Sequence, residues 1–149
     1  MQQFGPTFNR ESYDNVILNN ADDSTLRRFR LAISTTGEYA AFHGGTLASV
    51  NAAINTTMTR VNALFEMDFN STMVIVANNN NVIYLNAATD PYGATDANYN
   101  TEVQAAITAQ IGAANYDIGH LMSAIGNNGN AGCIGCICGT DTQSWTSLG

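Results

Sequence analysis

The chain of 149 residues contains no lysine, and its five basic residues are all arginines. Charged residues make up only 11% of the chain, against about 25% in typical globular proteins. Acidic residues outnumber basic ones twelve to five, which gives a net charge of −7. A protein without a basic patch has little to hold a phosphate backbone, so we expect no nucleic-acid partner.

Long apolar runs and cysteines are also scarce. No apolar run reaches the roughly 18 residues that a membrane-spanning helix needs, so no membrane span is expected. The first residues, Met1–Pro6, show neither the basic nor the apolar region of a signal peptide. Low charge with many Asn, Thr, Ser and Gly residues favours a secreted or cell-surface protein. The three cysteines are an odd number, so outside the cell one thiol is free or pairs beyond this chain.

The length allows one domain or a piece of one, and the 45% hydrophobic content is enough for a core. Residues 1–25 are polar and rich in turn formers, so we interpret them as a leader or linker, or the end of a propeptide. Residues 26–149 carry the periodic apolar patterns and are interpreted as the folded unit.

An alternating pattern predicts a strand at Phe29–Thr35, and short apolar runs predict strands at Thr72–Ala77, Ile118–Ile125 and Ala131–Cys138. The apolar run at Thr72–Ala77 suggests a strand covered on both faces. Four asparagines, Asn78–Asn81, predict a turn because Asn tolerates positive φ. The extended segment that follows, Val82–Leu85, would form a hairpin or continue an interrupted strand.

Two helices are predicted between these strands. The first runs from an N-cap at Thr46 to about Asp68, with one wide apolar stripe and an opposite face, including Asn62, toward water. The second spans about Asn98 to Gly112. Strands that alternate with helices predict an α/β fold with a mostly parallel twisted sheet. The loop before Ala131–Cys138 is too short for a crossover, so that strand is expected to be an antiparallel edge.

The cysteines Cys133, Cys136 and Cys138 could form part of a zinc site or a redox pair. On a strand, however, Cys133 points away from the other two, and no helix follows. Structural or disulfide-forming roles therefore fit them better, and their pairing stays open.

His120 follows Asp117 by three residues, which places the two on opposite faces of a strand rather than in an acid–base pair. A structural role beside the sheet is expected for this histidine. His43 precedes Gly44-Gly45 and a helix, so a capping or surface role is expected, with anion binding as the alternative. Nothing pairs the single carboxylates at element ends with a nucleophile.

Five runs together resemble one family. They are Arg30–Tyr39 (RLAISTTGEY), Phe42–Gly45 (FHGG), Arg60–Glu66 (RVNALFE), Met73–Asn78 (MVIVAN) and Ala114–His120 (ANYDIGH). In order and spacing they resemble the N-terminal half of bacterial reprolysin-like zinc metallopeptidases, which are metzincins. The resemblance covers about residues 26–139. It implies the upper subdomain of the metzincin catalytic domain, with a sheet whose antiparallel edge strand pairs with an extended peptide substrate.

On this resemblance Ala131–Cys138 is the substrate edge. Gly132, Ile134, Gly135 and Ile137 would supply main-chain groups to a peptide. The resemblance also implies zinc, held by H-E-x-x-H-x-x-G-x-x-H, but this motif is absent from the 149 residues. No catalytic residue or zinc ligand is therefore assigned.

These observations lead to one expectation and one alternative. We expect the N-terminal part of a secreted zinc endopeptidase, incomplete at its C-terminus, lacking the second half of its domain and inactive alone. The alternative is a small α/β binding or adhesion module that uses an exposed sheet edge.

Overall fold

The computed structural model describes residues 24–124 and 129–130. Its elements are, in chain order, β1 (Arg27–Thr35), α1 (Gly37–Phe42), α2 (Leu47–Phe69), β2 (Ser71–Ile75), α3 (Tyr99–Gln110) and β3 (Ile118–Met122). Short 3₁₀ helices lie at Asn79–Val82, Asp96–Asn98 and Ala113–Asn115. The strands form an all-parallel sheet in the order β2-β1-β3, which confirms the predicted α/β class and parallel sheet. The predicted edge strand Ala131–Cys138 lies outside the described residues.

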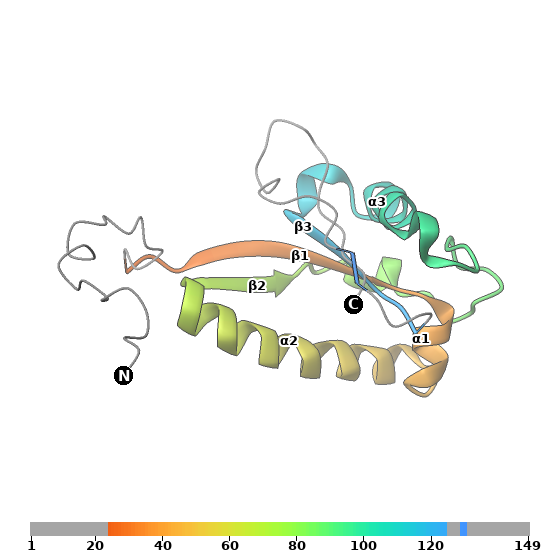
Figure 1. Cartoon of the computed structure of the whole chain (residues 1–149), viewed down its shortest axis with the longest axis horizontal. Helices are drawn as coiled ribbons and strands as arrows, with labels where there is room; N and C mark the ends of the chain where they lie inside the picture. Colours follow the sequence, from red (N-terminus) through yellow and green to blue (C-terminus); the bar gives the residue numbers. More distant parts are fainter. Residues whose placement is uncertain (1–23, 125–128, 131–149) are drawn as a thin grey trace, which may run out of the picture.

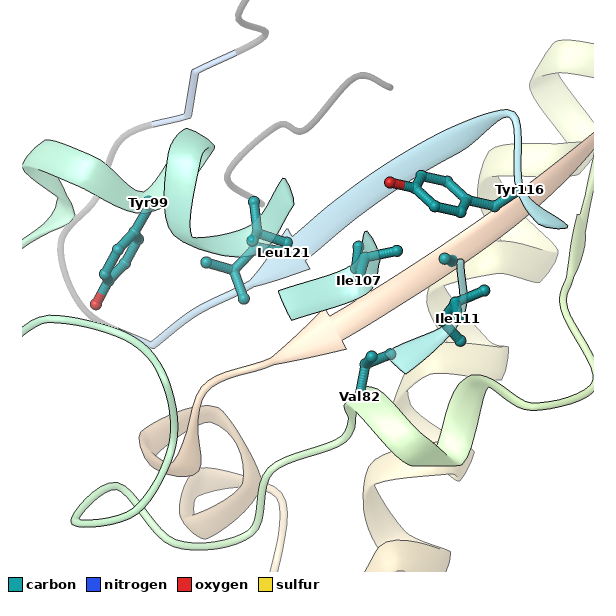
Figure 2. Packing of buried hydrophobic residues seen from close by; sticks show 8 residues of the cluster. Val82, Tyr99, Ile107, Ile111, Tyr116 and Leu121 are labelled. Atoms are coloured by element: carbon teal, nitrogen blue, oxygen red, sulfur yellow. The ribbon is translucent and has the colours of Figure 1, made fainter. Parts of the chain in front are cut away.

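The sheet lies between α2 on one face and α3 on the other (Figure 1). Toward α2, the core contains Leu31 and Ile33 of β1 with Val50, Ile54 and Met58 of the helix. The other core gathers residues of α3, β3 and the segments around them, as Figure 2 shows: Val82, Tyr99, Ile107, Ile111, Tyr116 and Leu121. Alternate residues of a strand point to opposite faces, so β1 supplies side chains to both cores.

The predicted helix after Thr46 is confirmed, because the Thr46 hydroxyl accepts a hydrogen bond from Ser49 N and forms a capping box. The last part of its predicted apolar stripe is exposed instead: Leu64, Phe65 and Phe69 are 56%, 39% and 55% exposed. A helix of 23 residues is about 34 Å long, whereas the five residues of β2 span about 17 Å. β2 begins at Ser71, directly after the Asn70 C-cap, so the helix extends past β2 at its N-terminal end, and its exposed last turns lie beside the start of the strand (Figure 1).

Three further details differ from expectation. A third helix, α1, follows β1 directly because Thr36 caps it, and the sequence did not predict it. The predicted strand Thr72–Ala77 ends at Ile75, and all five residues of β2 are only half-buried, so it is not covered on both faces. The segment after the asparagines forms no hairpin, since Ile83 makes an isolated parallel bridge to Thr35 and so extends the pairing along β1.

The asparagine turn exists, but positive φ does not explain it. Asn79–Val82 form a 3₁₀ helix, and none of the four asparagines has a positive φ. Within the described part of the chain, no helix is long and apolar enough to cross a membrane.

Candidate functional site

The outer edge of β2 is covered by a side chain from α2. Asn62 Oδ1 accepts a hydrogen bond from Met73 N at 3.0 Å, and Asn62 Nδ2 donates to Met73 O at 2.8 Å. A single amide side chain thus takes the two backbone groups that an added strand would use. The prediction that Asn62 faces water was wrong, because the helix lies close enough to reach the strand edge.

A second asparagine closes the same side of the sheet farther along. β2 ends at Ile75, and beyond it the side chain of Asn79 forms the hydrogen bonds to β1 that a strand would make. Its Oδ1 accepts from Ile33 N at 2.7 Å and its Nδ2 donates to Ile33 O at 3.0 Å. Asn79 and Ile33 are 4% and 0% exposed. The β2 side of the sheet is therefore closed to an incoming peptide at both Met73 and Ile33.

The opposite outer strand of the described sheet is β3, which pairs with β1 from Leu31↔Ile118 to Thr35↔Met122. The predicted substrate-binding residues Gly132, Ile134, Gly135 and Ile137 lie outside the described residues.

Asp117, just before β3, acts as a clamp rather than as an acid–base partner. Its Oδ1 accepts from Arg30 Nη2 at 2.7 Å, and its Oδ2 accepts from the backbone N of Arg30 at 2.6 Å. Arg30 Nη1 also donates to the carbonyl of Ala114 at 2.7 Å. The hydrogen bonds from the Arg30 side chain hold the pKa of the Asp117 carboxyl below its usual range.

His120 is held in β3 away from this clamp. It lies in register with Ile33, whose side chain packs in the core beneath α2, so His120 projects toward the same face. Burial lowers the pKa of the imidazole to about 4, which keeps the ring neutral near pH 7. The expected separation of His120 from Asp117 is confirmed.

His43 is the C-cap residue of α1, and its backbone N–H bonds back to the last turn of that helix, as expected for a capping role. The ring packs against Tyr39 and Phe42, at centroid distances of 4.4 and 5.0 Å. Gly44 and Gly45 have φ values of 95° and 69°, so the turn into α2 itself requires glycine.

Nothing in the described residues fits a zinc ion. Within residues 24–124 and 129–130, no group of three His, Cys, Asp or Glu side chains is arranged to bind a metal. The two histidines of the chain lie on separate elements, after α1 and in β3. The described residues do not supply a zinc site, and Cys133, Cys136 and Cys138 lie outside them, so no zinc ligand is assigned.

Residues 25–147 match the family described as metallo-peptidase family M12B, reprolysin-like. The chain belongs to this reprolysin-like family. No curated protein matches the chain. The reprolysin-like match includes the predicted edge at Ala131–Cys138, so that segment is part of the family domain.

Sequence reasoning missed three contacts in this reprolysin-like domain: the two asparagine caps and the Arg30–Asp117 clamp. One signal was present, because an asparagine run directly after a short apolar strand offers amides at the point where pairing stops. An amide side chain carries a donor and an acceptor, as a peptide unit does. No comparable signal links Asn62 to Met73 or Arg30 to Asp117, since only the packing of the elements brings each pair together.

Proposed function

We propose that this chain is the substrate-holding part of a secreted zinc-dependent endopeptidase of the reprolysin-like family. It binds an extended peptide by main-chain hydrogen bonds on the β3 side of its sheet. The observation that carries this proposal is the closure of the β2 side by two asparagine side chains. Asn62 and Asn79 close the β2 side, which leaves the β3 side for strand addition.

In this proposal Gly132, Ile134, Gly135 and Ile137 present N–H and C=O groups to the peptide. Glycine removes side-chain bulk, and the segment carries no charge, so a second backbone can approach closely. Residues 26–149 are the folded unit and residues 1–25 are a leader or linker. The family match, which begins at residue 25, supports that boundary.

The bond-breaking step in such a peptidase is attack by a zinc-activated water. The motif that would bind the metal is not among the 149 residues, and the residues described do not replace it. We therefore propose that this chain by itself binds peptides without hydrolysing them. The alternative, a binding or adhesion module that uses a sheet edge, would also bind without hydrolysis. A zinc motif encoded in the gene near these 149 residues would favour the peptidase, and its absence would favour the binding module.

Peptide binding is tested by fluorescence anisotropy with labelled, extended casein-derived peptides. Gly135→Pro removes one N–H from the edge and is expected to weaken binding at least tenfold. Gly135→Ala keeps that N–H and serves as the matched control. Equal binding by the wild type and the proline variant, with both folded by circular dichroism, would refute strand addition at this segment.

Hydrolysis is tested separately with a quenched-fluorescence peptide and added zinc. We expect no turnover by the 149-residue chain. Zinc-dependent turnover that is abolished by chelation would contradict the proposal that the chain only binds. A variant that opens the other edge, Asn62→Ala, is expected to leave peptide binding at the β3 side unchanged.

A further inference from the structure

A groove of about 830 Å³ lies on the open part of the sheet face toward α3. It is lined by residues of β1, of β2 and the segment after it, and of the approach to β3: Arg28, Arg30, Val74, Ile75, Val76, Ala77, Asn78, Asn115 and Asp117. The groove therefore lies on the face of the sheet, over β1 and β2, and not along the β3 side proposed for substrate.

The floor of the groove is apolar sheet surface that α3 does not cover. α3 packs mainly on β3 and on the segment Asn79–Val82, and its buried residues face Ala32 and Leu121. Val76 is packed against the edge of that core but is still partly exposed, as is Val74. Both faces of a parallel sheet are normally covered, so this strip can bury a further apolar group.

The two arginines in the groove differ in what they bind. The Arg30 guanidinium is held by Asp117 and by the carbonyl of Ala114. Arg28 lies two residues earlier on the same face of β1 and is exposed. Among residues 24–124, its side chain makes no hydrogen bond or ion pair. With Asp117 neutralised by Arg30, Arg28 gives the groove one uncompensated positive charge, in a chain whose net charge is −7.

Amide groups complete the polar lining. Asn78 is exposed at the end of the groove beyond β2. Asn115 Nδ2 donates to Ile111 O at 2.6 Å, which fixes its amide and leaves a second N–H for a ligand. A guanidinium with nearby amide donors suits a carboxylate, because Arg binds that group with two parallel hydrogen bonds. A phosphate backbone is bound by several Lys or Arg residues together, so one uncompensated arginine does not suit it.

We propose that this groove is a second peptide-binding site, which takes an acidic segment of a protein partner. A Glu or Asp carboxylate of the partner pairs with Arg28, and a neighbouring apolar side chain packs on Val74 and Val76. The site depends on neither zinc nor the predicted edge at Ala131–Cys138. It would therefore hold this partner independently of strand addition.

The test uses the whole 149-residue chain and two fluorescein-labelled peptides, Leu-Glu-Leu-Glu and the neutral Leu-Gln-Leu-Gln. Affinities are measured by anisotropy for the wild type, Arg28→Gln and the control Arg60→Gln, which changes an exposed arginine on α2. We expect the acidic peptide to bind roughly tenfold more weakly to Arg28→Gln, as for the loss of a charge-assisted hydrogen bond, and unchanged to Arg60→Gln. Val74→Thr is expected to weaken binding without changing its dependence on salt.

Three results would overturn the proposal of this site. The wild type could bind the two peptides equally, or Arg28→Gln and Arg60→Gln could lose the same affinity for the acidic peptide. The third result is no binding of the acidic peptide at millimolar concentration. Binding of a single-stranded oligonucleotide that Arg28→Gln abolishes, without binding of the acidic peptide, would also overturn it. Gly135→Pro separates this site from the proposed edge, because it should leave binding of the acidic peptide intact.

Discussion

Replacing Asn79 by alanine tests the most unusual contact of the sheet. The Asn79 amide donates to and accepts from the backbone of Ile33, at 3.0 and 2.7 Å, in the gap where β1 has no strand partner. The substitution removes both partners at once and leaves Ile33 N–H and C=O in a place that water does not reach, since Ile33 is 0% exposed. The prediction is a large loss of stability from a single polar residue.

The magnitude follows from two orphaned groups. Each buried backbone group without a hydrogen bond costs about 1–3 kcal/mol, so Asn79→Ala should lower the free energy of unfolding by about 2–6 kcal/mol. The neighbouring Asn80 is the matched control. It is exposed, and its side-chain Oδ1 accepts a hydrogen bond from Asn51 Nδ2 at 3.0 Å, in a place open to water. Asn80→Ala should therefore change the stability by no more than about 0.5 kcal/mol.

Urea unfolding followed by far-ultraviolet circular dichroism measures the difference. With an m-value of about 1–3 kcal/mol/M, a loss near 4 kcal/mol moves the midpoint down by roughly 1–4 M. Asn79→Asp is a second test, because a carboxylate can accept from Ile33 N but cannot donate to Ile33 O while ionised. If Asn79→Ala and Asn80→Ala had the same midpoint, the cap on β1 would contribute nothing and the reasoning would be refuted.

Two further predictions concern the end and the start of strand β1. At its end, Gly37→Ala should destabilise the protein by at least about 3 kcal/mol or prevent folding, since an added Cβ would lie 2.0 Å from Ala87 N; a soluble variant with an unchanged melting temperature would contradict this. Toward its start, Asp117→Asn should cost stability near pH 7. The folded pKa of this carboxyl is lowered by Arg30, so its contribution is present above the unfolded pKa and fades as the pH falls below about 4. Unfolding measured at pH 7 and pH 3 should show the gap from wild type closing, and a gap that widens in acid would exclude the clamp.

The long regular elements could be predicted from the sequence because their signals are local. The helix after Thr46 has a hydroxyl cap and apolar residues at spacings of three and four, and both act within a few residues of each other. The strand ending at Thr35 and the helix beginning near Tyr99 were likewise placed to within two residues. Such patterns report which face of an element avoids water, and the buried residues Val103, Ala106, Ile107 and Ile111 bear this out.

The edges of the sheet could not be predicted in the same way. Asn62 belongs to the polar face of its helix by pattern, and its contact with Met73 depends on how closely the helix lies against β2. The asparagine turn was predicted correctly, but for the wrong reason, because the function of Asn79 depends on a strand 46 residues earlier in the chain. The predicted peptide edge and its four residues remain a prediction.

The sequence by itself determined the class of the protein: an α/β unit with a mostly parallel sheet, acidic, without a zinc motif, and similar to reprolysin-like metallopeptidases. These properties rest on composition, on the periodicity of apolar residues and on the order of motifs, all of which can be determined from the linear sequence without the fold. Only the tertiary structure decided which side of the sheet is closed. A strand edge is closed by whichever donor and acceptor reach it, and here these are Asn62 and Asn79, which folding brings to the strands. It also placed Arg28 over apolar strand surface, because strands distant in sequence must first be paired side by side to form a groove.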